Sequence, residues 1–160
     1  MTDSPMLSFR RHVARLAFGL VFAILAVGVS DAQTAKPEVQ VWKDPACGCC
    51  ADWVVHLENH GFSVSVRDEG NHLKRRELGV APQYASCHTA VVDGYVIEGH
   101  VPAADIRRLL VEKPDALGLA VPGMPIGSPG MDSPVYGGRQ DPYQVLLLQK
   151  HGSAEVFNAY

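Results

Sequence analysis

Residues 39–50 read Val-Gln-Val-Trp-Lys-Asp-Pro-Ala-Cys-Gly-Cys-Cys, and they contain the end of one predicted element and the start of the next. The first four residues alternate and are rich in strand formers, and Asp44-Pro45 then ends the strand. Over residues 50–60 the apolar side chains recur at the three- and four-residue spacing of an amphipathic helix, and Gly61 follows as a C-terminal cap. The clustered cysteines, Cys47, Cys49 and Cys50, therefore lie where a strand passes into a helix.

The rest of the chain shows the same two kinds of pattern. Strict alternation predicts strands, an Asp-Gly pair predicts a tight hairpin turn, and three-to-four spacing predicts helices. The predicted elements are a strand at 62–66, a helix at 72–78, a hairpin of 89–92 and 95–98 around Asp93-Gly94, a helix at 102–110 and a last hairpin of 143–148 and 154–157. Residues 113–142 are rich in proline and glycine and have no apolar period, so we expect a long irregular loop there.

This order of elements resembles that of a thioredoxin-like domain. A C-x-x-C pair, Cys47 and Cys50, stands in the usual place for that fold, after the first strand and at the start of the first helix. The predicted fold class is therefore α/β, a thioredoxin-like mixed sheet flanked by helices, with a long Pro/Gly-rich loop and a C-terminal hairpin. Where that fold has a proline facing the cysteines, just before Thr89, this chain has Cys87-His88.

The composition indicates one small globular domain behind an export signal. The chain has 160 residues, of which 47% are hydrophobic, and its formal net charge of -3 leaves no broad basic surface for nucleic acid. An arginine-containing start precedes an apolar run at 16–29 and small residues up to Ala32, the pattern of a cleaved secretory signal. The run is about 14 residues, short of the roughly 20 that span a bilayer, so an uncleaved anchor is the weaker alternative. We predict a signal peptide at 1–32, cleaved near Ala32, and a periplasmic domain at 33–160 without a stable membrane span.

The third cysteine of the cluster favours metal binding over dithiol redox chemistry. A helix N-terminus stabilises thiolates, which suits both kinds of chemistry. A dithiol catalyst needs one attacking and one resolving sulfur, and Cys49 would divert its disulfide. Adjacent helical residues project about 100° apart, so Cys49 and Cys50 suit different ions or a bridge between several ions. Soft thiolates and thioethers select Cu(I), and Met124 and Met131 lie together in the Pro/Gly-rich loop.

Other interpretations of these residues are open at this point. Four cysteines in an exported domain form two structural disulfides by default. Zinc needs four ligands around one ion, and Cys47, Cys50, Cys87 and His88 provide such a set. An iron–sulfur cluster is disfavoured, because it would have to be inserted before export. His88 can be an ordinary turn histidine, and His100 can simply cap the helix that follows it.

Two histidines of the first helix offer a further metal-binding pattern. His56 and His60 lie one helical turn apart, at a spacing that can chelate an ion. Together with Asp52, however, they form a polar stripe opposite the apolar face of the helix. We therefore expect a solvated helix surface at these residues.

Four motifs occur in a characteristic order along the chain. They are Asp44-Pro45-x-Cys47-Gly48-Cys49-Cys50-x-x-Trp53, Ser86-Cys87-His88-Thr89-Ala90, Glu98-Gly99-His100-Val101-Pro102 and the glycine- and proline-rich stretch 118–131. Together they resemble a bacterial family long described only as a domain of unknown function, which includes the CopG-type periplasmic copper-resistance proteins. The resemblance covers nearly all of residues 38–158. It implies a thioredoxin-like fold, a cysteine-bridged copper cluster and a role in copper tolerance.

We therefore predict an exported protein that binds Cu(I), with more than one ion in a thiolate-bridged cluster, for copper resistance or homeostasis. The predicted metal ligands are Cys47, Cys49, Cys50, Cys87, His88, His100, Met124 and Met131. The task would be sequestration of copper, its transfer to other exported copper-handling proteins, or a change of its oxidation state, and binding is favoured over enzymatic turnover. The rival prediction is a periplasmic thiol–disulfide oxidoreductase that uses Cys47 and Cys50. A zinc-stabilised binding module is a third possibility.

Overall fold

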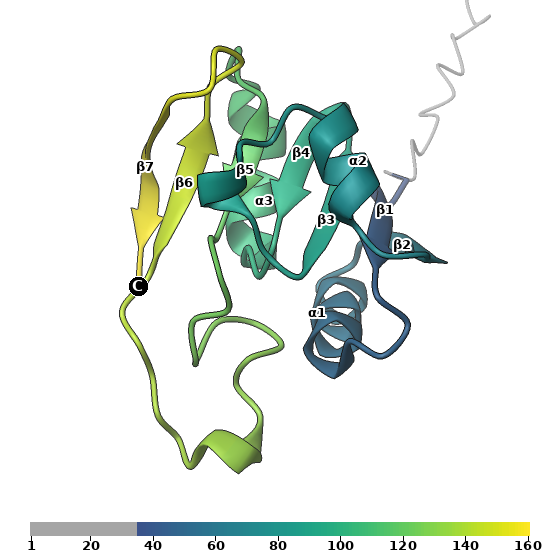
Figure 1. Ribbon diagram of the computed structural model, residues 1–160, viewed down its shortest axis with the longest axis vertical. Coiled ribbons are helices and arrows are strands. Elements are labelled where there is room, and N and C mark those ends of the chain that lie inside the picture. Colours follow the sequence, from purple (N-terminus) through teal and green to yellow (C-terminus); the bar gives the residue numbers. More distant parts are fainter. Residues whose placement is uncertain (1–34) are drawn as a thin grey trace, which may run out of the picture. The chain divides into compact units, whose positions relative to one another are not determined.

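The computed structural model describes residues 35–160, which form a seven-stranded sheet with helices on both of its faces (Figure 1). The strands are β1 (Glu38–Lys43), β2 (Ser63–Asp68), β3 (His88–Val92), β4 (Tyr95–Glu98), β5 (Gly118–Ala120), β6 (Gln144–Leu148) and β7 (Ala154–Ala159). The helices are α1 (Gly48–Asn59), α2 (His72–Glu77) and α3 (Ala103–Glu112), and short 3-10 turns occur at Pro82–Tyr84 and Pro134–Tyr136.

The sheet is mixed, with the strand order β2-β1-β3-β4-β5-β6-β7. The β1–β2 and β4–β5 pairs are parallel, and the other neighbouring pairs are antiparallel. The predicted α/β class, with a mixed sheet flanked by helices and a C-terminal hairpin, is confirmed. The arrangement of β1 to β4 with α1, α2 and α3 does not conflict with the predicted thioredoxin-like order.

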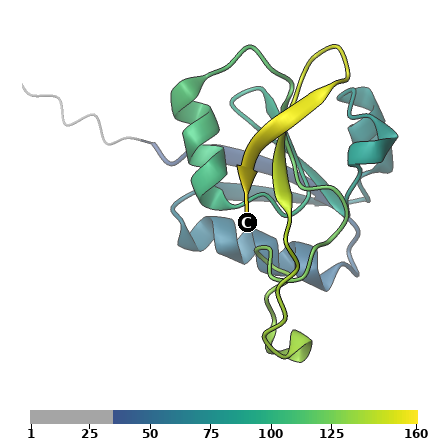
Figure 2. The same cartoon turned by 90° about the vertical axis from the view of Figure 1, so that its left-hand side faces the viewer.

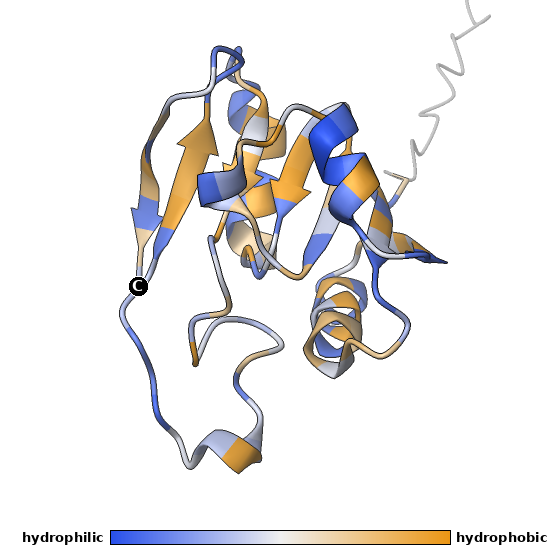
Figure 3. Ribbon diagram, viewed as in Figure 1, coloured by the Kyte–Doolittle hydropathy of each residue, from blue (hydrophilic) through white to orange (hydrophobic). Residues whose placement is uncertain are grey.

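The two faces of the sheet bury separate apolar clusters. Val39 and Val41 of β1 are fully buried and pack with Trp53 and Leu57 of α1 and with Ile106 of α3. On the other face, near α2 and the turn that follows it, a smaller cluster forms around Val80, Val96, Ala120 and Leu148. Figure 2 shows α3 and α2 on opposite sides of the sheet, and Figure 3 shows that β4 and β6 are largely hydrophobic, as expected of strands covered on both faces.

The Asp93-Gly94 hairpin and the β1–α1 junction form where the sequence predicts them. Asp93 and Gly94 both have positive φ, at 47° and 81°, which is the geometry of the tight turn joining β3 and β4. Helix α1 starts earlier than predicted, at Gly48, so that Cys49 and Cys50 both belong to its first turn.

The prediction of an unbroken irregular loop at 113–142 is wrong. Residues Gly118–Ala120 form β5, which lies between β4 and β6 and is buried along its whole length. A three-residue strand that is covered on both faces has no polar–apolar alternation, so its pattern carried no strand signal. The remainder of the segment, after β5, is the Pro/Gly-rich loop that covers the first turn of α1.

The predicted signal peptide at 1–32 lies outside the described residues, so its cleavage and the periplasmic location stay predictions. Of the helices within residues 35–160, none combines the length and the apolar character needed to cross a membrane.

Candidate metal centre

Three cysteine side chains lie at the N-terminus of α1. Cys47 occupies the N-cap position with extended backbone, and its side chain makes no capping hydrogen bond. The preceding turn is held by Asp44, whose carboxylate accepts a hydrogen bond from the Ala46 amide at 2.8 Å. Cys49 and Cys50 follow in the first helical turn, where free backbone amides and the helix dipole favour thiolates.

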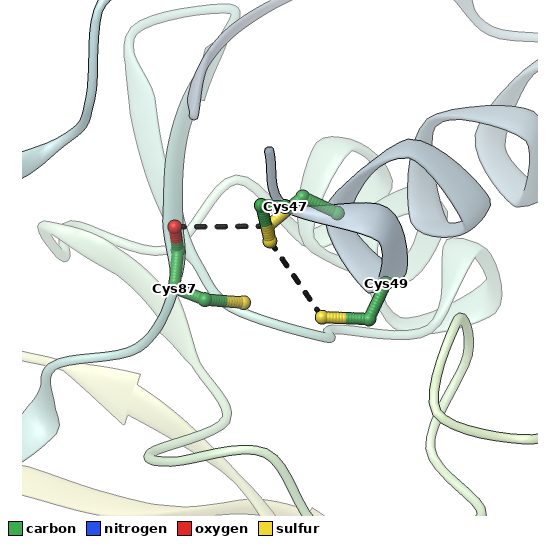
Figure 4. A group of neighbouring side chains, drawn as sticks. Cys47, Cys49 and Cys87 are labelled. Carbon is green, nitrogen blue, oxygen red and sulfur yellow. Dashed lines mark hydrogen bonds between the residues drawn. A yellow bond between two sulfur atoms is a disulfide. The ribbon is translucent and has the colours of Figure 1, made fainter. Parts of the chain in front are cut away.

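The fourth cysteine, Cys87, precedes β3 and faces this cluster (Figure 4). The sulfur atoms of all four cysteines lie within 4.8 Å of one another. A disulfide joins Cys47 to Cys50, and Cys49 and Cys87 are free thiols. The Sγ atoms of Cys47 and Cys49 are 3.6 Å apart, and Sγ of Cys50 lies 3.7 Å from the carbonyl oxygen of Cys87. The structure therefore brings together all four cysteines that the sequence singled out.

Cys87 also belongs to a second group, made with two buried histidines. Its Sγ lies 3.4 Å from Nδ1 of His88 and 3.1 Å from Nε2 of His100. Nδ1 of His100 donates a hydrogen bond to the carbonyl oxygen of Pro129 at 2.8 Å, which leaves the lone pair of Nε2 directed at the sulfur. A backbone carbonyl that fixes an imidazole in this way is a common outer partner of a metal ligand.

Both imidazole rings are neutral near pH 7. Burial lowers the pKa of His88 well below its usual value, and the neighbouring His100 lowers it further. Burial also lowers the pKa of His100, against the opposing effect of its hydrogen bond to Pro129. Neutral rings keep a lone pair for a metal ion, so the electrostatics of the site favour ligation over ion pairing.

His88 carries an unsatisfied polar atom. Its ring packs against Trp53, with ring centres 4.3 Å apart, and the Trp53 indole N–H donates to the carbonyl oxygen of Val101 at 2.9 Å. Among residues 35–160, Nε2 of His88 is the one fully buried side-chain nitrogen or oxygen without a hydrogen-bond partner. Buried polar atoms without partners are rare, and this one belongs to a ring whose other nitrogen lies beside the Cys87 sulfur, which is compatible with a site that holds an ion.

The Cys87 thiol is protonated at neutral pH. Burial raises its pKa to about 12, and the nearby Cys49 contributes to the increase. Metal ions bind the thiolate, so any ion that reaches Cys87 has to displace a proton. The site is consequently poised for a soft ion that competes strongly for sulfur, and it is a poor source of free nucleophilic thiolate.

A buried carboxyl group fixes the backbone that carries Cys87. Glu98 is fully buried and accepts hydrogen bonds from the Ser86 amide at 2.7 Å, from the Thr89 hydroxyl at 2.5 Å and from the Arg75 guanidinium at 3.4 Å. Burial raises the pKa of Glu98, and the hydrogen bonds from Thr89, Ser86 and Arg75 oppose this increase. The carboxyl group therefore positions the turn that precedes β3.

The carbonyl group of Ser86 is held by α2 and by the residue before it. The carbonyl oxygen of Ser86 accepts hydrogen bonds from Asn71 and from Arg75, both at 3.1 Å. Sequence reasoning quoted Glu98 in a motif but gave it no role, and it passed over Asn71 and Arg75. The only available signal was a charged residue ending an otherwise apolar strand.

The Pro/Gly-rich loop closes over the cysteines from the other side. Gly130 has a φ of 82°, and a Cβ atom there would lie 2.6 Å from the Cys49 carbonyl oxygen and 2.8 Å from the Trp53 amide. Only glycine permits this approach of the loop to α1. The two loop methionines differ: Met131 is buried, with its sulfur 3.7 Å from the Tyr136 hydroxyl, whereas Met124 is half-exposed.

The prediction of a solvated stripe at His56 and His60 is wrong for His56. Its ring is partly buried, and Nε2 accepts a hydrogen bond from the Ala103 amide at 3.1 Å, the first residue of α3. Burial, with a contribution from His60, lowers the pKa of His56 to about 4. The capping role that sequence left open for His100 is thus performed by His56, because the end of α1 packs beside the start of α3.

Comparison with known proteins gives results that agree with this geometry. Residues 84–131 match the family described as "Protein of unknown function, DUF411". Two solved structures, both titled copper resistance protein CopG, are 48% and 49% identical in sequence, with TM-scores of 0.73 and 0.72. Each alignment covers 78% of this chain and 98% of the CopG chain. This chain belongs to the CopG family. No protein of the curated collection matches it.

The segment matched to the DUF411 description contains much of the candidate site. It includes Cys87, His88, His100 and both loop methionines. The three cysteines of α1 precede that segment. The resemblance stated from the four motifs is therefore confirmed.

Proposed function

We propose that this protein binds Cu(I) in a thiolate-bridged site that holds more than one ion, as part of copper resistance or homeostasis. The proposed ligands are Cys47, Cys49, Cys50 and Cys87, with His88 and His100 and with one or both of Met124 and Met131. The observation that carries the proposal is the position of Cys87, whose sulfur is shared between a group of four cysteines and a group with two neutral histidines.

The donor set favours copper in its reduced state. Thiolate sulfur and neutral imidazole nitrogen are soft and borderline donors, and thiolates in particular select Cu(I). Zinc is served by four donors around one ion, whereas this site offers six cysteine and histidine donors in two groups that share the Cys87 sulfur. The CopG titles of the two similar structures support the choice of copper.

Metal loading requires the disulfide to be reduced. Cys47 and Cys50 can donate thiolate sulfur only after their bond has been opened, which takes two electrons and two protons and yields two thiols. We therefore regard the disulfide form as the metal-free, oxidised state of the site, and a dithiol reductant as the way to prepare the protein for loading.

The test is a Cu(I) titration of the reduced protein under anaerobic conditions. We expect uptake of more than one ion per chain, and we expect Cys49→Ser to lower the number of ions, because it removes a bridging sulfur. Ala51→Ser is the matched control, since it places the same side chain at an exposed position of the same helical turn. A stoichiometry of one ion, unchanged by Cys49→Ser, contradicts the multinuclear site.

A second candidate function is thiol–disulfide exchange through Cys47 and Cys50. The disulfide between these residues at a helix N-terminus is the observation that favours it. Reduction of insulin by the protein, retained in Cys49→Ser, would support this candidate. Loss of copper uptake in that variant without any insulin-reducing activity would support the copper site.

We further propose that the protein acts in the periplasm after removal of residues 1–32. The predicted signal pattern supports this location. Its task there would be to sequester copper, to pass it to other exported copper-handling proteins or to change its oxidation state. N-terminal sequencing of the protein recovered from its native compartment tests the cleavage near Ala32.

A further inference from the structure

A cleft of about 390 Å³ opens beside Cys87. Of the four cysteines, only Cys87 lines it. Met124 lines it as well, and the opposite wall is formed by the turn after β1 and by the start of α2. The cleft thus connects solvent with the one sulfur that both donor groups share.

Two hydrogen bonds connect the residue before Met124 to the residues that precede Cys87. The Gly123 amide donates to the carbonyl oxygen of Ala85 at 3.0 Å, and the Ser86 hydroxyl donates to the carbonyl oxygen of Gly123 at 2.5 Å. These bonds attach the residue before Met124 to the two residues before Cys87. The backbone next to Met124 is therefore in a defined place, while Met124 itself is 51% exposed.

Exposure of this side chain has no explanation in packing. Met131, in the same loop, is buried and its sulfur lies 3.7 Å from the Tyr136 hydroxyl. Met124 instead leaves a soft sulfur in solvent contact at the margin of the cleft that reaches Cys87. A half-exposed thioether on an anchored backbone is suited to binding a soft ion from solvent.

The charges around the cleft do not repel a monovalent cation. Arg75 lines the cleft, but its guanidinium is paired with the buried Glu98 carboxyl group. Asp44 lines the cleft too and adds a carboxylate at the same opening. A cation can therefore approach without meeting an uncompensated positive charge.

We propose that this cleft is the entrance for Cu(I) and that Met124 is the first protein ligand of the incoming ion, which it passes to Cys87. The inference rests on the proposed function and adds a route to it: it assigns Met124 to entry alone, which leaves Met131 as the methionine ligand of the loaded site. In the transfer, the bond between copper and the Met124 sulfur breaks and the bond to the Cys87 sulfur forms, while the Cys87 thiol proton goes to solvent water and copper stays Cu(I). A thioether binds without losing a proton, so it can hold the ion before the Cys87 proton departs.

The rate of copper uptake tests this entrance. Cu(I) is offered to the anaerobically reduced protein as its bicinchoninate complex, and loss of the chelator colour is followed by stopped-flow absorbance. We expect Met124→Leu, which keeps the side-chain size and removes the sulfur, to slow uptake about tenfold and to leave the final number of ions unchanged. The control is Val135→Leu, because Val135 is exposed in the same loop and does not line the cleft; this variant should keep an initial rate within about twofold of the unsubstituted protein.

Thiol labelling of the metal-free protein gives a second measurement. Met124→Trp fills the mouth of the cleft, so iodoacetamide should label Cys87 more slowly, while labelling of Cys49 keeps its rate. Mass spectrometry of the digested protein reports both sites. Equal labelling of Cys87 with and without the tryptophan would show that the cleft is not its access route.

The possible failures are distinguishable. If the unsubstituted protein takes up no Cu(I), the proposed function fails and the entrance fails with it. If Met124→Leu takes up copper at the original rate, or if Val135→Leu is slowed equally, only the entrance is wrong. A lower final stoichiometry in Met124→Leu would make Met124 a permanent ligand and would also overturn its role as an entrance.

Discussion

Replacing Glu98 with alanine removes the acceptor for three donors around the turn that carries Cys87. The Ser86 amide and the Thr89 hydroxyl lose their partner, and the Arg75 guanidinium, whose side chain is only 13% exposed, loses its counter-charge. Removing one member of a buried ion pair typically costs about 3–5 kcal/mol. Because burial raises the pKa of Glu98 and so weakens its charged form, we take the lower end, about 3 kcal/mol, of a total stability of about 5–15 kcal/mol.

Urea unfolding of the reduced, metal-free protein at pH 7 measures this loss. With an m value of about 1.5 kcal/mol per molar urea, the midpoint should fall by about 2 M. Glu98→Gln keeps an oxygen acceptor for the Ser86 amide but loses the second acceptor oxygen, at the Thr89 hydroxyl, and the charge opposite Arg75, so it should cost about 1–2 kcal/mol.

The matched control is Glu77→Ala. Glu77 pairs with Lys74 at 2.9 Å on the exposed side of α2, and exposed pairs contribute about 0.5 kcal/mol or less. If Glu98→Ala unfolds within about 1 kcal/mol of this control, the buried network does not hold the Cys87 turn as we have argued.

Two further predictions concern the helix α1 and its contacts. His56→Gln keeps an acceptor for the Ala103 amide but cannot titrate. In the folded protein the pKa of His56 is about 4, below the value of about 6.5 in the unfolded chain. The unsubstituted protein should therefore lose stability as pH falls from 6.5 to 4. Because the ring is partly exposed, we expect about 1 kcal/mol of this pH-dependent loss to disappear in the variant. If the urea midpoint falls by the same amount between pH 7 and pH 4.5 in both proteins, the prediction is contradicted. Gly130→Ala should cost about 1–2 kcal/mol more than Gly138→Ala, because both have positive φ but only Gly130 would push a Cβ atom against Cys49. Thermal unfolding compares the two glycine variants, and equal melting temperatures would show that the loop does not rest on α1.

Several parts of the fold were predictable because their signals are local. The Asp93-Gly94 turn follows from the ease with which these residues adopt positive φ, and the strand–cysteine–helix junction follows from a change of apolar period within a few residues. The strand β5 was not predictable in this way. Its three residues are buried by neighbours that are distant in sequence, so no pattern within the segment reports them.

The residues of the candidate site fall into the same two groups, those with a local signal in the sequence and those without one. Four cysteines, the Cys87-His88 pair and the loop methionines could be recognised from residue type and spacing alone, because soft donors at a helix start are chemically unusual. The network of Glu98 with Arg75 and Asn71 could not, because it joins α2 to the end of β4 and the turn before β3. Hydrogen bonds between such distant residues leave no periodic trace in the chain.

By itself, the sequence determined which atoms are available for copper and which elements carry them, since both depend on residue type and on local backbone preference. Only the tertiary structure decided that Cys87 is shared between sulfur and imidazole donors, that His56 caps α3, and that one methionine is buried while the other stands at the cleft. These three outcomes depend on how the sheet, α1 and the loop pack together. Packing is set by the complementary shapes of segments far apart in the chain, and the sequence does not display it locally.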